Sequence, residues 1–252
     1  MIGASREAGR LEWDKAWSRD FMVKNNLPVP AYQVCKTEEE GLKFLQFQKE
    51  QAWFIKAAGL AEGKGVIPAR DNSHATEAIR EMARFGNAGE TYLIEQALVG
   101  EEFSAFAISD SEGWKFLGTA QDHKRVDDGD VGPNTGGMGC ATPPLIVNEN
   151  IKKQIEDIFE KTFVGLKKEN LNYQGILYLG GIVVKEANAE KVYIIEYNAR
   201  WAYCDWETLG NCFPVTMFPS HDSHSCNCLN FDFSIVSSTL DLVRGRGAPS
   251  PL

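Results

Sequence analysis

The fold is decided by residues 54–66, which read FIKAAGLAEGKGV. Apolar runs stand on both sides of a glycine-rich turn, so the stretch predicts two strands, 52–57 and 66–69, joined by a short loop. Lys56 interrupts the first run, where a buried charge is costly unless it has a partner. The loop glycines free the backbone to fold its N–H groups around phosphate oxygens. We therefore predict a phosphate-binding loop; a plain glycine hairpin with a surface lysine is the alternative.

The loop differs from the P-loop of strand–helix nucleotide-binding units. Its spacing from Gly59 to Gly63 is one residue short, and Gly65 stands where the P-loop has a magnesium-binding Ser or Thr. The loop also joins two strands instead of a strand and a helix. These differences exclude a P-loop.

Outward from this loop, the chain alternates predicted helices and strands. Helices are predicted over 5–25, from Thr37 onward, over 73–85 and over 151–169, and further strands over 31–35, 91–98, 102–109, 114–118, 175–184 and 191–197. Residues 121–144 show no apolar period and are predicted to form a long functional loop. Because the order is mixed and contains antiparallel pairs, we predict the α+β class instead of a doubly wound α/β fold.

The composition is that of a globular protein of 252 residues, with 43% hydrophobic and 24% charged residues. The net charge of −9 argues against a general nucleic-acid surface. It leaves room for a nucleotide, since a phosphate site needs only a few cations and backbone N–H groups. No apolar run approaches the roughly 18–20 residues that span a bilayer, and the first residues lack the apolar core of a signal peptide. We therefore predict a cytoplasmic protein in which most of the six cysteines are free thiols.

Two segments carry polar groups that suit a nucleotide and an anionic substrate. Residues 93–102 run from an apolar strand through a short linker to two acids, so linker backbone can pair with an adenine edge and a carboxylate can accept ribose hydroxyls. Residues 121–139 place QDHKR and DDGD before the glycine-rich GPNTGGMG. Opposite charges this dense suit charge-assisted bonds to an anionic substrate. A solvated charged loop is the alternative for the second segment.

A last segment, residues 194–200, reads IIEYNAR and predicts a metal site. Alternate residues of a strand share a face, so Glu196 and Asn198 point the same way, about 7 Å apart. Two such oxygen ligands can hold Mg²⁺ ions that bridge ATP phosphates. Arg200, next on that face, could reach the γ-phosphate. An exposed strand face is the alternative.

Taken together and in this order, these segments resemble the glycinamide ribonucleotide synthetase (phosphoribosylamine–glycine ligase) family of the ATP-grasp superfamily. The matching segments are 56–66, 122–125, 132–139, 175–180 and 196–200, and the resemblance runs from about residue 2 to about residue 208. It implies an α+β fold whose two subdomains grip ATP between antiparallel sheets. The domains it implies are a first part of the core over 1–50, a lid over 51–100, the core with substrate loop and magnesium strand over 101–210, and a divergent or poorly ordered tail over 211–252.

The resemblance also implies an activity and a role for each site residue. The family joins glycine to 5-phosphoribosylamine with ATP, through a glycyl phosphate, in purine nucleotide biosynthesis, and uses Mg²⁺ or Mn²⁺. The residues it assigns are Lys56, Gly63, Lys64, Gly65, Glu95, Gln96, Leu98 and Glu102 for ATP; Glu196 and Asn198 for the metal; Lys64, Asp122, His123, Lys124, Arg125 and Arg200 for catalysis; and Asn134, Thr135, Gly136, Gly137, Met138, Asp205 and Glu207 for the other substrates.

The chain departs from the family pattern in three places. The match begins after the family's N-terminal domain, two residues are added within 201–208, and residues 211–252 do not follow its C-terminal domain. The alternative to an active ligase is therefore an incomplete, nucleotide-binding remnant, or an assembly partner completed by another polypeptide. The partners we expect are the small-molecule substrates, with neither nucleic acid nor membrane. A homo-oligomer or a complex with other purine-pathway enzymes stays open.

Overall fold

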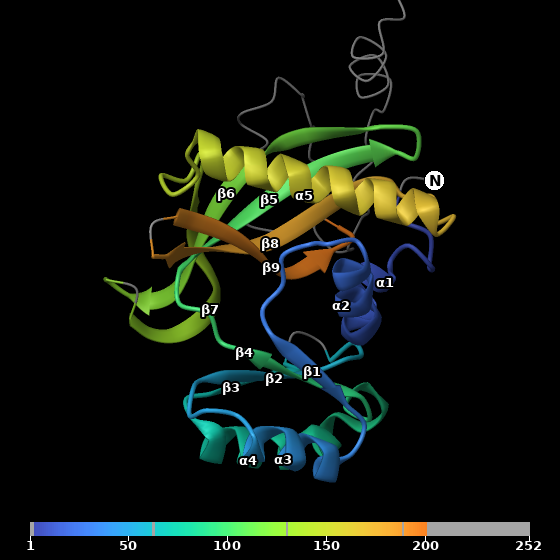
Figure 1. Ribbon diagram of the computed structural model, residues 1–252. Coiled ribbons are helices and arrows are strands. Elements are labelled where there is room, and N and C mark those ends of the chain that lie inside the picture. Colours follow the sequence, from blue (N-terminus) through green and yellow to red (C-terminus); the bar gives the residue numbers. More distant parts are fainter. Residues whose placement is uncertain (1–2, 62–63, 130, 188, 201–252) are drawn as a thin grey trace, which may run out of the picture.

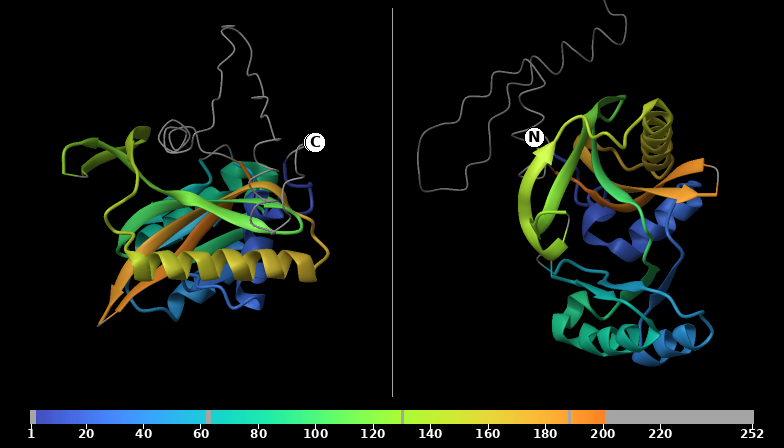
Figure 2. Two further views of the ribbon diagram at one scale, coloured as in Figure 1. Left: turned by 90° about the horizontal axis from the view of Figure 1, so that it is seen from above. Right: turned by 90° about the vertical axis from the view of Figure 1, so that its left-hand side faces the viewer.

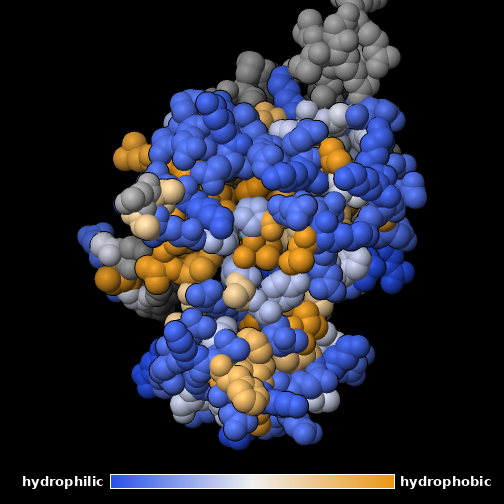
Figure 3. All heavy atoms as spheres, in the orientation of Figure 1, coloured by the Kyte–Doolittle hydropathy of each residue, from blue (hydrophilic) through white to orange (hydrophobic). Residues whose placement is uncertain are grey.

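The computed structural model describes residues 3–61, 64–129, 131–187 and 189–200, which form two lobes built on separate sheets (Figure 1). The lobes meet at a narrowed waist, and apolar residues lie exposed on both sides of it (Figure 3). No helix of the described residues is long and apolar enough to cross a membrane.

The smaller lobe is a four-stranded antiparallel sheet with two helices on one face (Figures 1 and 2). The strand order is β1-β4-β2-β3. Trp53, Ile55 and Ile79 lie in the apolar core between sheet and helices. The elements are β1 (Tyr32–Cys35), α3 (Glu38–Gln46), β2 (Trp53–Ala57), β3 (Val66–Ala69), α4 (Asn72–Glu81), the 3-10 helix η1 (Met82–Ala88) and β4 (Tyr92–Gln96).

The larger lobe is a five-stranded antiparallel sheet with one long helix across a face (Figure 1). The strand order is β7-β6-β5-β8-β9. Ile151, Ile155 and Phe159 repeat at helical spacing, and this stripe packs in the core with Leu177 and Leu179 of the sheet. The elements are β5 (Glu101–Asp110), β6 (Trp114–Asp127), β7 (Val131–Ala141), α5 (Glu149–Lys168), β8 (Gln174–Glu186) and β9 (Ala189–Asn198).

Two short helices, α1 (Arg10–Trp13) and α2 (Lys15–Lys24), lie beside the larger sheet near the waist (Figure 1). The prediction of one continuous helix over 5–25 is wrong. The break falls at Asp14, whose backbone leaves the helical region (φ −128°, ψ 86°) and whose side chain accepts from Trp17 N at 3.0 Å. Aspartate is a preferred N-cap, so its side chain stabilises a new helix start where apolar periodicity shows no interruption.

The prediction of a loop over 121–144 is also wrong, because β6 and β7 pair through most of it. The register runs from Gln121 opposite Ala141 to Asp127 opposite Val131, with two irregular shifts between them. Several of these residues are exposed, and a strand without a buried face needs no alternation of apolar and polar residues. Gly129 (φ 81°) lies in the turn between the strands, in the left-handed region that glycine adopts without strain.

The strand predicted over 114–118 continues to Asp127, and the helix predicted over 73–85 ends at Glu81 and is followed by η1. The other predicted helices and strands are confirmed, apart from shifts of a few residues at their ends, and so is the α+β class. The elements β1 and α3, which precede the domain boundary predicted at residue 50, pack within the smaller lobe.

Candidate functional site

Three charged side chains are buried where the lobes meet. They are Lys56 on β2, Glu95 on β4 and Arg19 on α2, with 6%, 2% and 4% of their surface exposed. Lys56 Nζ donates to Glu95 Oε1, and Arg19 Nε donates to Glu95 Oε2 at 2.8 Å. Burial alone raises the pKa of the Glu95 carboxyl, but the Lys56 and Arg19 charges outweigh it and hold that pKa below its ordinary value. The partner that the sequence demanded for Lys56 is therefore an ionised Glu95.

Lys15, at the start of α2, lies beside this cluster and was missed by the sequence analysis. It lines a small cavity together with Lys56 and Glu196. Burial lowers the pKa of the Lys15 ammonium, the Glu196 carboxylate opposes that shift, and the Lys56 charge adds to it, so that the net shift is downward. Two partly dehydrated ammonium groups facing one cavity favour an anionic ligand such as a phosphate.

The end of β9 brings the predicted metal ligands and the predicted catalytic arginine together. Asn198 Nδ2 donates to Glu196 Oε1 at 3.4 Å, and Arg200 Nη2 donates to Asn198 Oδ1 at 3.4 Å, so the three side chains share one side of the strand as predicted. Glu12 of α1 holds this end: its Oε1 accepts from Arg200 Nε at 2.9 Å and its Oε2 from Ala199 N at 2.8 Å. Glu12, like Lys15, is not among the residues predicted from the sequence.

The chemistry of the β9 donors fits a magnesium ion. Glu196 is exposed, whereas Asn198 is buried, with 7% of its surface exposed. A carboxylate and an amide oxygen are therefore held at the rim of the site. No group of three or more His, Cys, Asp or Glu in the described residues could hold a metal. Mg²⁺ is commonly bound through one or two protein oxygens plus waters and substrate phosphates, which suits a pair of ligands facing a nucleotide.

A second cavity next to this strand collects further predicted residues. Glu102 and Ser104 of β5, Asp122 of β6, Tyr178 of β8 and Glu196 of β9 line it. Asp122 Oδ1 is buried and has no hydrogen-bond partner among the described residues. A buried acceptor of this kind calls for a donor from a ligand, such as a hydroxyl, an amine or an ordered water. The cavity therefore brings the predicted ribose and substrate residues Glu102 and Asp122 to Glu196, one of the predicted metal ligands.

The glycine-rich loop connects β2 and β3 at the same end of the smaller sheet. Ala57 N donates to Gly65 O at 2.7 Å, and a Cβ on Gly65 would lie 2.7 Å from Ala61 Cβ, so this approach requires glycine. Lys64 is exposed. Gly63 lies outside the described residues.

The predicted adenine linker follows β4. Gln96 N donates to Ala31 O at 2.8 Å and Ala97 N donates to Ala52 O at 3.1 Å, which anchors the strand end between its neighbours. Leu98 is half-buried. Because the Glu95 carboxylate is engaged by two cations, contact with a base would fall to the backbone of 95–98 and the Leu98 side chain.

The remaining predicted residues are placed only in part. The segments 122–125 and 134–138 lie on the paired strands β6 and β7, with His123 opposite Gly139, and His123 and Met138 are exposed. Asp205 and Glu207 lie outside the described residues, as does the whole predicted tail.

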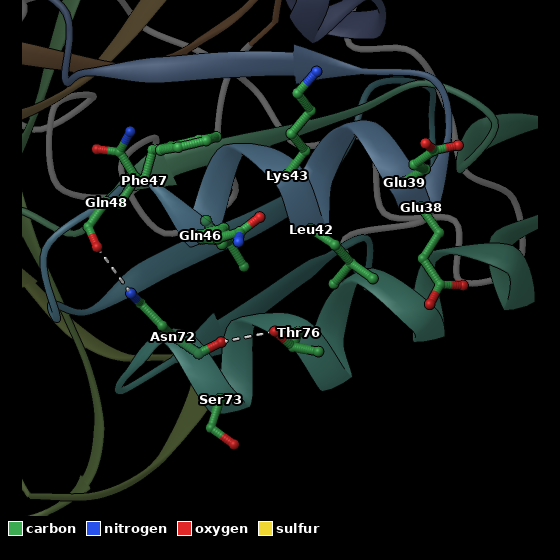
Figure 4. A pocket seen from close by; sticks show the side chains of 11 residues that line it. Glu38, Glu39, Leu42, Lys43, Gln46, Phe47, Gln48, Asn72, Ser73 and Thr76 are labelled. Atoms are coloured by element: carbon green, nitrogen blue, oxygen red, sulfur yellow. Dashed lines mark hydrogen bonds between the residues drawn. The ribbon is translucent and has the colours of Figure 1, made fainter.

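A groove of about 1090 Å³ lies elsewhere, between α3 and α4 on the outer side of the smaller lobe (Figure 4). Leu42, Phe47 and Thr76 line it, and Asn72 Nδ2 donates to Gln48 O at 3.4 Å across one end. It contains none of the predicted site residues. We therefore place the candidate site at the waist.

Comparison with known proteins identifies relatives of this chain. The family model described as phosphoribosylglycinamide synthetase, ATP-grasp (A) domain, matches residues 13–208. The phosphoribosylamine–glycine ligase of Chlorobaculum tepidum is 36% identical over 204 residues, covering 79% of this chain and 47% of that protein. The trifunctional purine biosynthetic protein adenosine-3 of Drosophila melanogaster is 36% identical over 204 residues, covering 79% of this chain and 15% of that protein. The chain thus spans about half the length of one relative and far less of the other.

Solved structures agree with this relationship. The phosphoribosylamine–glycine ligase of Thermotoga maritima superimposes with a TM-score of 0.74 at 32% identity, covering 99% of this chain and 58% of that one. D-alanyl-alanine synthetase A of Vibrio cholerae superimposes with a TM-score of 0.66 at 17% identity, covering 96% and 68%. At that lower identity the likeness concerns the fold alone.

Proposed function

The chain belongs to the family of phosphoribosylglycinamide synthetase ATP-grasp (A) domains, and on this basis we propose that it carries the nucleotide site of a cytoplasmic phosphoribosylamine–glycine ligase. Such an enzyme transfers a phosphoryl group from ATP to the glycine carboxylate. The amine of 5-phosphoribosylamine then attacks the resulting acyl phosphate and phosphate leaves. The observation that carries the proposal is a pair of cations, the half-buried Lys15 and the buried Lys56, that line one cavity between the lobes together with Glu196.

In this proposal each charged group stabilises a different part of the charge involved in phosphoryl transfer. Lys15 and Lys56 hold phosphate oxygens from one side, and Lys64 approaches from the glycine-rich loop. Glu196 and Asn198 hold Mg²⁺ or Mn²⁺, which supplies charge neutralisation between the phosphates and the Glu196 carboxylate. Arg200, anchored by Glu12, meets charge that develops on the transferring group.

The second cavity, with the strands that border it, binds the nucleotide ribose and the other substrates in this proposal. Glu102 accepts the ribose hydroxyls of the nucleotide. Asp122, with its unpartnered oxygen, accepts from a donor of the amine substrate. The segments 123–125 and 134–138, followed by Asp205 and Glu207, complete the binding of glycine and 5-phosphoribosylamine.

Thermal unfolding tests the nucleotide site. Mg-ATP at about 100 times its dissociation constant should stabilise the folded chain by about 2.7 kcal/mol and raise the melting temperature accordingly. Glu196→Ala should remove most of the shift, whereas Glu77→Ala, on the exposed side of α4, should keep it. A full shift in Glu196→Ala would contradict the metal assignment.

Product analysis tests the ligase chemistry separately. We expect ADP to form only when glycine and 5-phosphoribosylamine are both present with Mg-ATP. ADP formation in the absence of glycine or of 5-phosphoribosylamine would contradict the proposed reaction. It would not contradict the proposed nucleotide site.

A further inference from the structure

The Arg19 side chain contacts both lobes at the candidate site. It projects from α2, which packs with the larger lobe through Phe21 and Met22. On the side of the smaller lobe, its Nε and Nη2 lie 2.8 and 2.6 Å from Glu95 Oε2. On the side of the larger lobe, its Nη2 donates to the carbonyl oxygen of Ile195.

The two partners of Arg19 are the immediate neighbours of the proposed phosphate and metal ligands. Glu95 receives the hydrogen bond of Lys56, so the position of the lysine ammonium follows that of the carboxylate. Ile195 directly precedes Glu196 on β9. The Arg19 guanidinium is therefore connected to the Lys56 ammonium through Glu95. On the other lobe it bonds the residue directly before Glu196.

Other contacts show that this face of α2 is the joint between the lobes. Lys15 N donates to Ala58 O of the smaller lobe at 3.0 Å, and Tyr32 Oη of β1 donates to Asp20 Oδ1 at 3.3 Å. The first of these hydrogen bonds joins two backbone groups, and the second lies at the exposed surface. The Arg19 side chain, in contrast, is 5% exposed and lies between Glu95 of the smaller sheet and Ile195 of the larger one.

We propose that Arg19 is a positioning residue that fixes the spacing between Lys56 on the smaller lobe and Glu196 on the larger lobe. This role rests on the proposed nucleotide site. A planar guanidinium offers donors in several fixed directions and can hold a carboxylate and a carbonyl at once, while a lysine ammonium is a point charge at the end of a flexible stem. A merely stabilising buried ion pair would need the charge of Arg19 but not its geometry.

The test measures the spacing of the lobes without any nucleotide. Spin labels that do not react with cysteine are introduced at two exposed positions, Ser73 on α4 and Lys153 on α5, and the distance distribution between them is recorded. We expect a narrow distribution in the parent chain and a broader or displaced one in Arg19→Lys and Arg19→Met. Arg80→Lys is the matched control, because Arg80 pairs with Glu38 at the exposed surface of the smaller lobe.

A second arm measures Mg-ATP affinity in the same variants by calorimetry. A hydrogen bond to a charged group is worth enough that Arg19→Lys should weaken binding by about 10-fold or more, with Arg80→Lys unchanged. A folded Arg19→Lys variant that keeps both the narrow distribution and the parent affinity would overturn the proposal, even if Arg19→Met fails to fold. Should the parent chain itself not bind Mg-ATP, the proposed function fails, and the distance arm still decides whether Arg19 sets the spacing.

Discussion

At the residue scale, the arginine at the end of β9 depends on an acid from a distant part of the chain. Glu12 lies 188 positions before Arg200 and accepts from its Nε at 2.9 Å. Arg200 also donates to Asn198 Oδ1, at a longer 3.4 Å. The shorter, charged bond to Glu12 should therefore contribute to the orientation of the Arg200 guanidinium.

Replacing Glu12 by alanine should change which nucleotide the chain prefers. If Arg200 meets the γ-phosphate, its misplacement weakens ATP binding more than ADP binding, because ADP lacks that group. We expect Glu12→Ala to lower the preference for Mg-ATP over Mg-ADP by about 10-fold, the value of one charge-assisted hydrogen bond. Calorimetric titration with both nucleotides measures the ratio, and Glu77→Ala serves as the control. Equal weakening of both nucleotides would assign Glu12 a purely structural role.

Residue by residue, the sequence predicted side chains within strands better than it predicted those on α2. Lys56 stood out because it interrupts an apolar strand, and Glu196 and Asn198 because strand residues alternate. Lys15 and Arg19 were not among the residues predicted for the site. Arg19 follows Lys15 by four residues and the buried Met22 follows Arg19 by three, so the three residues share one helix face, which is the signal that was available. Their partners could not be predicted, since periodicity does not reveal contacts with distant strands.

At the scale of elements, local capping decides where helices begin, and one cap should give α4 a pH-dependent stability. Asp71 accepts from His74 N at 2.8 Å, and this bond to the backbone, with a further one to the His74 side chain, lowers the pKa of Asp71 to about 2 from 3.8. A carboxyl whose pKa is depressed by folding stabilises the fold above its unfolded pKa. That contribution is lost as the pH falls from about 4 to about 2.

The pair Asp71→Asn and Asp71→Ala separates the charge from the cap. Asparagine is also a good N-cap but does not titrate, so Asp71→Asn should match the parent chain more closely at neutral pH than Asp71→Ala. The stability advantage of the parent chain over Asp71→Ala should shrink as the pH falls toward 2, and thermal melts across that range would record it. A constant difference would mean that the ionised carboxylate contributes nothing.

The contact between α5 and β9 offers a test of buried polar pairing. Thr162 Oγ1 lies 2.6 Å from Tyr197 Oη and donates to Ile158 O at 2.7 Å, and both side chains are almost wholly buried. Thr162→Val leaves the tyrosine hydroxyl unpaired and should cost about 1–3 kcal/mol in urea unfolding. The double variant Thr162→Val/Tyr197→Phe should recover part of that loss, because both polar partners are then gone. Additive losses would mean that the two hydroxyls do not interact.

At the scale of the whole molecule, the fold could be predicted because its strong signals occur in a fixed order along the chain. The Lys56 loop, the charged segment 121–139 and the β9 strand each carried a plain alternative when viewed alone. That these segments meet between the two lobes could not be predicted from their spacing along the chain. No local pattern specifies that β2 and β9 face one another. The paired stretch of β6 and β7 within 121–141 escaped prediction for a different reason: several of its residues are exposed, so the backbone pairing leaves no apolar alternation in the sequence.

If the proposed site is correct, the protection of both lobes from hydrogen exchange by a nucleotide should depend on the metal. Lys15 and Lys56 can hold phosphates without a metal, whereas the Glu196 carboxylate repels them until a cation lies between. We therefore expect ATP with a chelator to slow amide hydrogen exchange mainly in 58–61 and 97–100. Mg-ATP should extend the protection to 196–200, because a ligand that contacts both lobes suppresses local opening in each of them. The hairpin at 185–187, far along β8 from the site, is the internal control. Protection of 196–200 by ATP alone, or its persistence in Glu196→Ala with Mg-ATP, would show that the metal does not join the lobes.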